Sequence, residues 1–383
     1  MYSQARWMNK TFLSLRLWFG VLLIALATNG YAQPKATIKW WNPANETQSV
    51  IEGQGWSDGL KNPYDRLPAK AEQVVREPVW NLSRHAAGLV LRFSSNAEQI
   101  IVRYTVNGNY AMNHMPSTGV SGVDLYAFDT NKQWAWCRAQ RDFSDTITYD
   151  FQGLKPDNKV SGGTEYHLFL PLYNSVKWLE IGVNEANTLD PIPVREEKPI
   201  VVYGTSIAHG ACASRPGMAW TSILSRMLDH PLINLAFSGN GRLEPEVIEL
   251  VAEIDAKLYV LDCLPNLTSE TQYPDQELRR RVLEAVRQLK SARPGVPILL
   301  VEHAGYTDGS IQTDRRTAYQ RVNRVQKAAY DELREDGIKG LYYLSNEQIN
   351  LQMDDMVDGT HPNDLGMMHY AEAYEQAVRK IMD

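Results

Sequence analysis

Residues 199–210, PIVVYGTSIAHG, join a buried apolar strand to a Gly-Thr-Ser turn. A continuous apolar run that ends at a glycine is typical of a strand covered on both faces of a parallel sheet. Gly204-x-Ser206-x-Ala208 nearly matches the G-x-S-x-G turn of serine hydrolases, but alanine takes the place of the second glycine. Ser206 is therefore either a nucleophile or an ordinary serine that caps the following helix. Its partners elsewhere in the chain decide between the two.

Strand-like and helix-like segments alternate after residue 199. Strands are predicted at 199–204, 232–237, 257–262, 297–302 and 340–345. Apolar residues at helical spacing predict a helix after each strand, at 217–229, 245–254, 276–291, 313–335 and from 364 onward. This alternation predicts a five-stranded parallel sheet buried on both faces over residues 198–383. In a three-layer αβα, flavodoxin-like domain such a sheet has the strand order 2-1-3-4-5.

The preceding part of the chain has a different period. Seven short runs rich in β-branched and aromatic residues are separated by Gly, Asn, Asp and Ser, at 88–94, 99–106, 122–128, 133–140, 146–152, 166–172 and 177–183. No long amphipathic helix lies among them, so residues 33–190 are predicted to form an all-β sandwich domain. The segment 184–199 contains three prolines and mixed charges and is interpreted as a linker.

The first 32 residues have the pattern of a secretory signal peptide. Three basic residues precede an apolar run at 17–27, and small residues at 30 and 32 fit a cleavage site after Ala32. The apolar run is too short to span a bilayer, so we expect an exported protein, periplasmic or extracellular, with no stable membrane insertion after cleavage. Cleavage would change the net charge from −6 to −9, since −6 − 3 = −9. No basic block is present, and nucleic acid is not an expected partner.

Polar residues and glycines follow the predicted strands at the edge where a doubly wound sheet binds its ligands. Ser206 follows the first strand, Gly239 lies in SGNG after the second, and Asn266 ends DCLPN after the third. In the order 2-1-3 the loops of Gly239 and Asn266 flank Ser206, and both provide N–H donors for an oxyanion. Farther along, DGTHPND places Asp358 and His361 between the fifth strand and the last helix. His361 could accept the serine proton, and Asp358 could orient the imidazole.

These four segments, in this order, resemble the four blocks of the SGNH, or GDSL-type, serine hydrolase superfamily over residues 199–383. GVDLY at 122–126 resembles the motif of a branch with an N-terminal GxDLY-type β domain. The resemblance implies that Ser206 is the nucleophile, that His361 is the base with Asp358 as its orienter, and that the N–H groups of Ser206, Gly239 and Asn266 form the oxyanion hole. Two departures change the pocket walls: the motif's usual Gly-Asp-Ser is Gly-Thr-Ser here, and its Gly-x-Asn-Asp is Leu-Pro-Asn-Leu at 264–267.

Some residues have two interpretations. His209, His303 and Arg215 are candidate substrate contacts. The alternatives are a capping or surface role for His209, a structural hydrogen bond for His303 and a salt bridge for Arg215. Asp354 and Asp355 lie close to Asp358, and some dyad enzymes use a backbone carbonyl instead of an acid. Asn266 also begins a glycosylation triplet, which should be unmodified if it lines a pocket. Cys212 and Cys263 are either a disulfide pair or two small buried residues.

The predicted function is that of a secreted serine esterase that hydrolyses O-acyl, in particular O-acetyl, esters on carbohydrates. Its partner would be a small ester or an acylated glycan. The serine mechanism requires no cofactor and no metal, and no Cys/His cluster has zinc spacing. A lipase or thioesterase with the same machinery is one alternative. A carbohydrate-binding protein on a hydrolase scaffold that has lost its activity is the other. The oligomeric state, the acyl group and the sugar are not predicted.

Overall fold

The computed structural model describes residues 37–129, 131, 133–157 and 162–382. The predicted signal peptide, residues 1–32, lies outside the described residues. Within the described ranges, none of the helices combines the length and the apolar character that a transmembrane span requires.

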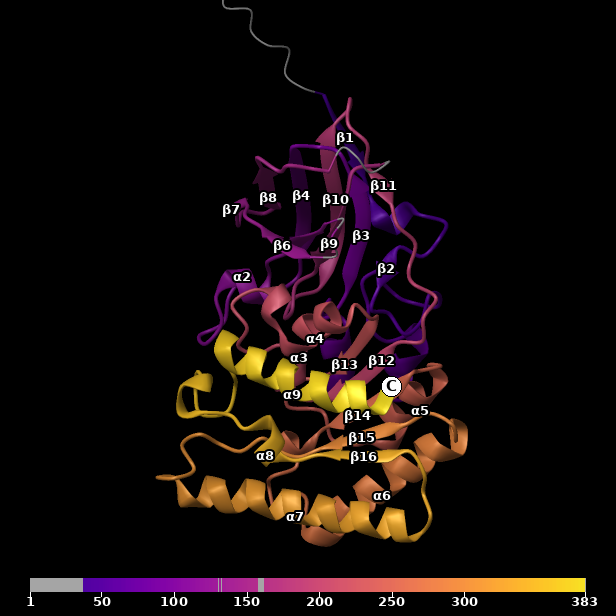
Figure 1. Cartoon of the computed structure of the whole chain (residues 1–383), viewed down its shortest axis with the longest axis vertical. Coiled ribbons are helices and arrows are strands. Elements are labelled where there is room, and N and C mark those ends of the chain that lie inside the picture. Colours follow the sequence, from indigo (N-terminus) through magenta and orange to yellow (C-terminus); the bar gives the residue numbers. More distant parts are fainter. Residues whose placement is uncertain (1–36, 130, 132, 158–161, 383) are drawn as a thin grey trace, which may run out of the picture. The chain divides into compact units, whose positions relative to one another are not determined.

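Two antiparallel sheets make up the N-terminal part of the described chain (Figure 1). The first has the order β1-β10-β4-β8-β7, with bounds Ile38–Trp41, Val176–Asn184, Gln99–Val106, Ile147–Gln152 and Gln140–Asp142. The second has the order β11-β3-β9-β5-β6, with β2 also paired to β3, and bounds Asp190–Pro191, Val90–Ser95, Thr164–Phe169, Asp124–Phe128, Trp134–Cys137 and, for β2, Ile51–Glu52. Each of the seven predicted strands overlaps one of these.

Alternating side chains explain why these segments form a sandwich. Along β4, Ile100, Val102 and Tyr104 are fully buried, while the residues between them are partly exposed. Leu91 and Phe93 of β3 belong to the same apolar cluster, so the inner faces of the two sheets share one core. A strand that buries every second side chain in this way covers the core with one face and meets solvent with the other.

The C-terminal part is a five-stranded parallel sheet with helices on both faces. Its strand order is β13-β12-β14-β15-β16, with bounds Leu232–Ala236, Ile200–Gly204, Leu258–Asp262, Ile298–Val301 and Leu341–Leu344. This is the predicted order 2-1-3-4-5, and the fold class is confirmed. The helices are α3 (Ser206–His209), α4 (Trp220–Leu228), α5 (Pro245–Glu253), α6 (Asp275–Ala292), α7 (Thr313–Glu335), α8 (Asn346–Ile349) and α9 (Asp364–Met382).

Neighbouring residues of β12 point to opposite faces of the sheet. Ile200 and Val202 pack in a cluster with α3, α4 and α9, whereas Val201 and Tyr203 pack with α5, α6 and α7. In Figure 1 α9 and the pair α6 and α7 accordingly lie on either side of strands β14, β15 and β16. Because both faces are covered, the strand is apolar without alternation.

A segment before β3 packs on the parallel-sheet part of the chain. The sequence patterns did not predict its short helix α1 (Glu77–Ser83) or its 3-10 helix η2 (Ala69–Gln73). Leu67, Val79 and Trp80 lie in the same apolar cluster as α5 and α6. This stretch lies within the predicted β domain, but it packs in the core of the parallel-sheet part. A further short helix, α2 (Ser117–Val120), lies between β4 and β5.

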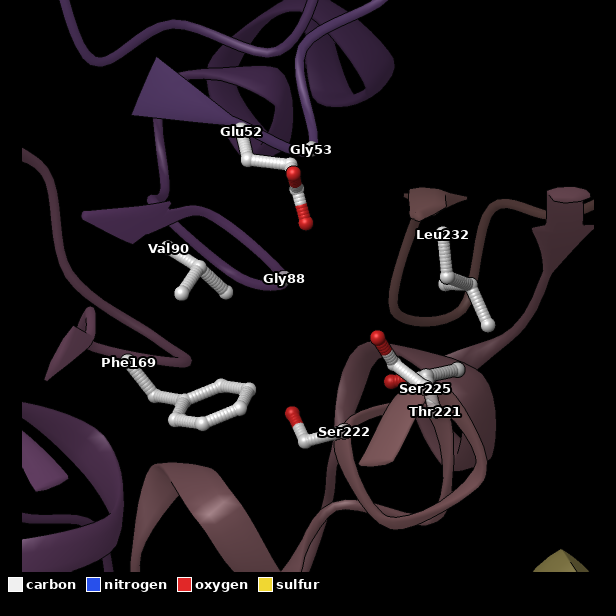
Figure 2. Close-up of a pocket in the computed structure, with 9 residues that line it drawn as sticks. All are labelled: Glu52, Gly53, Gly88, Val90, Phe169, Thr221, Ser222, Ser225 and Leu232. Carbon is white, nitrogen blue, oxygen red and sulfur yellow. The ribbon is translucent and has the colours of Figure 1, made fainter. Parts of the chain in front are cut away.

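A small cavity lies where Glu52, Gly88 and Phe169 face Thr221 and Ser225 of α4 (Figure 2). Its volume is about 10 Å³, room for at most one water molecule. None of the predicted catalytic residues is among the nine that line it.

The predicted linker is fastened along its length. Its β11 residues pair with β3, and the Val194 N–H donates to the Ser49 carbonyl over 3.1 Å. The Arg195 guanidinium donates to both carboxylate oxygens of Glu52, which is 7% exposed. Backbone hydrogen bonds and an ion pair thus hold this proline-containing segment in place.

Candidate active site

Three side chains form a hydrogen-bonded chain at the carboxyl edge of the parallel sheet. Ser206 Oγ lies 2.8 Å from Nε2 of His361, and Nδ1 of His361 lies 2.8 Å from Oδ2 of Asp358. An imidazole held in this way has one nitrogen to accept the serine proton and the other to donate to the carboxylate. The spacing suits a serine nucleophile with an oriented base.

Ser206 is placed by the abrupt change from strand to helix. β12 ends at Gly204, and Ser206 is the first residue of α3. A Cβ at Gly204 would lie 2.8 Å from the Ala208 Cβ, so glycine is required for the helix to turn back against the strand. The serine is 8% exposed, and its carbonyl accepts a hydrogen bond from the Tyr173 hydroxyl over 3.3 Å.

Gly239 and Asn266 lie on the loops that follow the two neighbours of β12. Gly239 has φ +68° in the turn after β13, and a Cβ on it would meet no atom within 4 Å. Asn266 ends the 3-10 helix η4 (Leu264–Asn266) after β14, and its Oδ1 accepts from the Gly241 N–H over 3.0 Å. This bond turns the amide so that Nδ2 is the group left to donate to a ligand. The open space at Gly239, its backbone N–H and Nδ2 of Asn266 fit the stabilisation of an oxyanion.

The loop of Asp358 and His361 is held by its own backbone and by α7. The Val357 N–H donates to the His361 carbonyl over 2.8 Å, and Gly359 has φ +75°. Arg315 of α7 donates to the Gly359 carbonyl over 3.1 Å and to the Thr360 hydroxyl over 2.8 Å. The imidazole is therefore carried on a loop fixed from two sides.

The Asp358 carboxylate is the acid that reaches His361. Partial burial raises its pKa, but the side-chain and backbone N–H donors of His361 outweigh that effect and hold the pKa below its ordinary value. Of its two acidic neighbours, Asp355 is fully buried and binds Nδ1 of His369 over 2.9 Å. Asp354 is bound through its backbone carbonyl to the side chain of Asn363. Asp358 thus occupies the orienting position expected from the sequence.

His209 lies away from this group, in the interior of the protein. Its side chain is fully buried, Nε2 donates to the Leu172 carbonyl over 2.8 Å, and its ring stacks on Tyr173 with centroids 4.2 Å apart. Burial lowers the pKa of His209 well below its ordinary value, and the nearby Arg66 charge acts in the same direction. An enclosed imidazole does not contact a substrate from solvent, and a fully buried ring is not a surface residue either; His209 is a buried histidine packed on Tyr173.

His303 and Arg215 are also engaged within the protein. His303 is 1% exposed, and its Nδ1 accepts from the Gly305 N–H over 3.0 Å. Burial lowers the pKa of His303 to about 3, so the ring is neutral. Arg215 forms an ion pair with Asp124 and a hydrogen bond with the Tyr126 hydroxyl. Those partners belong to the GVDLY stretch, so the salt-bridge alternative describes Arg215.

Several residues around the triad carried no signal that sequence reasoning used. Position 241 accepts only glycine, because a Cβ there would lie 2.2 Å from the Gly204 carbonyl oxygen. In the sequence Gly241 is simply the second glycine of SGNG. Arg315 is one of many arginines on an amphipathic helix. His114 comes from the β-rich part, and its ring centroid lies 5.9 Å from that of His361. Only the fold brings these residues together.

No group of three or more His, Cys, Asp or Glu residues among the described side chains is arranged to hold a metal ion. Cys137, Cys212 and Cys263 are buried free thiols, and Cys263 Sγ faces the Tyr203 carbonyl at 3.5 Å. The disulfide alternative for Cys212 and Cys263 is not the one found.

Two family models match the chain, one over the parallel-sheet part and one over the β-rich part. A family model described as GDSL-like lipase/acylhydrolase matches residues 197–379. A second model, described as the GxDLY N-terminus of SGNH hydrolase-type esterases, matches residues 38–189. No curated protein matches the chain.

Solved structures extend the similarity over both parts. A protein described as a GDSL-like lipase from Bacteroides ovatus is 30% identical with a TM-score of 0.80, covering 90% of this chain and 98% of its own. A salicylyl-acyltransferase from a tetracycline biosynthetic pathway is 17% identical with a TM-score of 0.70, covering 90% and 97%. A family two carbohydrate esterase from Clostridium thermocellum, solved with cellohexaose, is 12% identical with a TM-score of 0.52, covering 77% and 92%. The last two similarities concern the fold alone.

Proposed function

The chain belongs to the GDSL-like lipase/acylhydrolase family of carboxylic ester hydrolases, and from that premise we propose that it is a secreted serine esterase that removes O-acetyl groups from carbohydrates. The observation that carries the proposal is the hydrogen-bonded chain from Ser206 through His361 to Asp358, with two bonds of 2.8 Å. Secretion rests on the predicted signal peptide at residues 1–32.

In the proposed reaction Ser206 Oγ attacks the ester carbonyl carbon while His361 Nε2 takes the hydroxyl proton. The carbonyl oxygen becomes negative and is held by the backbone N–H groups of Ser206 and Gly239 and by Asn266 Nδ2. The C–O bond to the alcohol then breaks, and the alcohol leaves with the proton from His361. Water repeats these steps on the acyl-enzyme, which releases the acid and restores Ser206. Asp358, whose lowered pKa keeps it ionised at neutral pH, stabilises the imidazolium that forms in each step.

The choice of a carbohydrate ester draws on context. The Clostridium esterase shares the fold and was solved with a glucan oligosaccharide. The predicted export signal would place the chain where acetylated polysaccharides occur, and the sequence has no amphipathic lid of the kind that lipases use. These points favour a polar alcohol portion and a short acyl group.

A fluorophosphonate probe tests the nucleophile. We expect the probe to label the folded wild-type chain and to leave Ser206→Ala unlabelled, because a neutral serine without an activating base reacts slowly with such reagents. Ser225→Ala is the matched control, because Ser225 is a half-buried serine on α4 whose hydroxyl donates to the His230 carbonyl. Labelling that persists in Ser206→Ala, or no labelling of folded wild type, would remove Ser206 from the nucleophile role.

A substrate panel tests the specificity. Acetate release from acetylated glycans should exceed hydrolysis of long-chain esters and thioesters. The reverse preference would identify a lipase or thioesterase with the same catalytic groups. Glycan binding without any turnover would indicate a binding protein on a hydrolase scaffold.

A further inference from the structure

The β-rich part of the chain reaches the catalytic histidine through one turn. Met112 and Met115 close this turn with two backbone hydrogen bonds of 3.0 and 3.2 Å. Met115 is 2% exposed and packs in the apolar cluster that contains Ile207 of α3. Asn113 and His114, at the tip, are exposed. The turn therefore has a buried anchor in the hydrolase core and an exposed histidine.

The segment after the turn is fastened to the loop that follows α3. The Thr118 hydroxyl donates to the Ser214 carbonyl over 2.7 Å. A Cβ on Gly119 would lie 2.4 Å from the Ala213 carbonyl oxygen, so the two backbones touch. From the same loop the Cys212 N–H donates to the Pro362 carbonyl over 3.2 Å. One short stretch of chain, residues 212–214, thus holds both the His114 turn and the loop of His361 in place.

His114 faces the ring of His361 but does not compete for its nitrogens. The two ring centroids are 5.9 Å apart and the planes meet at 31°. Nε2 and Nδ1 of His361 are already engaged by Ser206 and Asp358. The imidazole of His114 consequently keeps its own donor and acceptor for a third group at the mouth of the site.

Resting on the proposed function, we propose that His114 contacts the alcohol portion of the ester and makes the β domain part of the substrate site. In the tetrahedral intermediate the oxyanion points to Gly239 and Asn266, while the departing oxygen must lie against His361 Nε2 to receive its proton. The alcohol is thereby directed to the His361 side of the centre, where His114 is exposed. A hydroxyl of a sugar alcohol would exchange a hydrogen bond with its imidazole.

Esters that share an acetyl group but differ in their alcohol test this assignment. All of them form the same acetyl-enzyme, so a contact with the alcohol affects acylation, measured as kcat/KM, and leaves deacylation unchanged. For His114→Ala we expect kcat/KM on a monoacetylated methyl glucoside to fall roughly 3- to 10-fold, the effect of one lost hydrogen bond. The value for 4-nitrophenyl acetate, whose leaving group lacks hydroxyls, should change less than twofold, on the order of experimental scatter.

Two variants make the test selective. His114→Gln retains a donor and an acceptor and should recover part of the loss on the sugar ester. Asn113→Ala alters the exposed neighbour on the same turn and should behave as wild type on both esters. An unchanged sugar-ester rate in His114→Ala, or an equal loss on both esters, would overturn the assignment. Failure of the proposed function itself would appear separately, as absent labelling of Ser206 or no wild-type turnover of the sugar ester.

Discussion

The side chain of Asn266 has two tasks that a pair of substitutions can separate. Its Oδ1 holds the Gly241 N–H at 3.0 Å, and its Nδ2 is the proposed donor to the oxyanion. Asn266→Asp keeps an acceptor for Gly241 but loses the donor and adds a negative charge. We expect kcat on 4-nitrophenyl acetate to fall by roughly 10²–10³-fold or more, as for other oxyanion donors.

Asn266→Ala removes both tasks and should be at least as impaired, with a loosened 238–241 turn as an additional cause. Asn240→Ala, on the same turn, serves as a control for changes in that loop. A near-normal kcat in Asn266→Asp would show that the amide does not stabilise the transition state.

Asp262, at the end of β14, is a buried acid that the proposed reaction does not use. It is 3% exposed, and its carboxyl accepts a hydrogen bond from the Tyr374 hydroxyl over 2.9 Å. Burial raises the pKa of this carboxyl from 3.8 to about 7. The folded chain therefore holds a proton that the unfolded chain releases near pH 4, and stability is lost as the pH rises through this interval.

Asp262→Asn should remove that dependence while keeping an acceptor for Tyr374. Between pH 5 and the folded pKa of about 7, Asp262 binds a proton in the folded wild type but not in the unfolded chain. This difference lowers the stability of the wild type by 1.36 kcal/mol per pH unit over about 2 units. The free energy of unfolding of the variant should therefore rise relative to wild type by roughly 3 kcal/mol between pH 5 and pH 8. Urea titrations at several pH values measure the difference, in which other titrating groups cancel. A difference that does not vary with pH would contradict the prediction.

At the scale of elements, the segment before β3 protects the edge of the parallel sheet. β13 is an edge strand, and the Arg66 guanidinium donates to its outward carbonyls at Asn234 and Ala236 over 2.9 and 2.8 Å. The same side chain also donates to the carbonyls of Leu82 and His85. Arg66 is 1% exposed, so these four acceptors have no ready access to water.

Arg66→Met should therefore destabilise the fold by about 3–5 kcal/mol, since it leaves several buried carbonyls without donors. Arg66→Lys should recover part of the loss through its three ammonium protons. Lys61→Met, which breaks an exposed pair with Glu72, is the matched control and should cost less than ~1 kcal/mol. Equal free energies of unfolding for Arg66→Met and wild type would show that the edge does not depend on this cation.

At the scale of the whole molecule, GVDLY connects the two folds. Asp124 is 3% exposed; Oδ2 accepts from the Gly217 N–H over 3.0 Å and pairs with Arg215, while Oδ1 accepts from Trp136 Nε1 over 2.6 Å. Tyr126 of the same stretch lies under the guanidiniums of Arg215 and Arg226. The motif is thus a joint between the β-rich part and the loop before α4.

Asp124→Ala should lower the free energy of unfolding by about 3–5 kcal/mol, because Arg215 would be left partly buried without its counter-charge. Asp145→Ala, at an exposed position of the same part, should stay within about 0.5 kcal/mol of wild type. Urea unfolding followed by tryptophan fluorescence measures both variants. A loss in Asp124→Ala no larger than in Asp145→Ala would contradict the role of the motif as a joint.

The extent of prediction differed between long and short elements. β12 shows as a continuous apolar run and α7 as apolar residues at helical spacing, and both lie where those patterns placed them. Elements such as β2, β11 and α1 span two to seven residues. That length is too short for a period to appear, and tertiary contacts stabilise them instead.

The amino-acid sequence by itself determined the alternation of strands and helices and the residue types at the strand ends, and a parallel sheet brings those carboxyl ends together at one edge. This is why Ser206 was expected beside Asp358 and His361, which share one loop far along the chain. Only the tertiary structure decided which polar groups remain available to a ligand. His209 Nε2, His303 Nδ1 and Arg215 each have a partner inside the protein, whereas Nδ1 of His209 and Nε2 of His303 are buried without one among the described residues. His114, which no local pattern marks, is exposed beside His361 because the β-rich part and the parallel-sheet part of the chain meet at that edge.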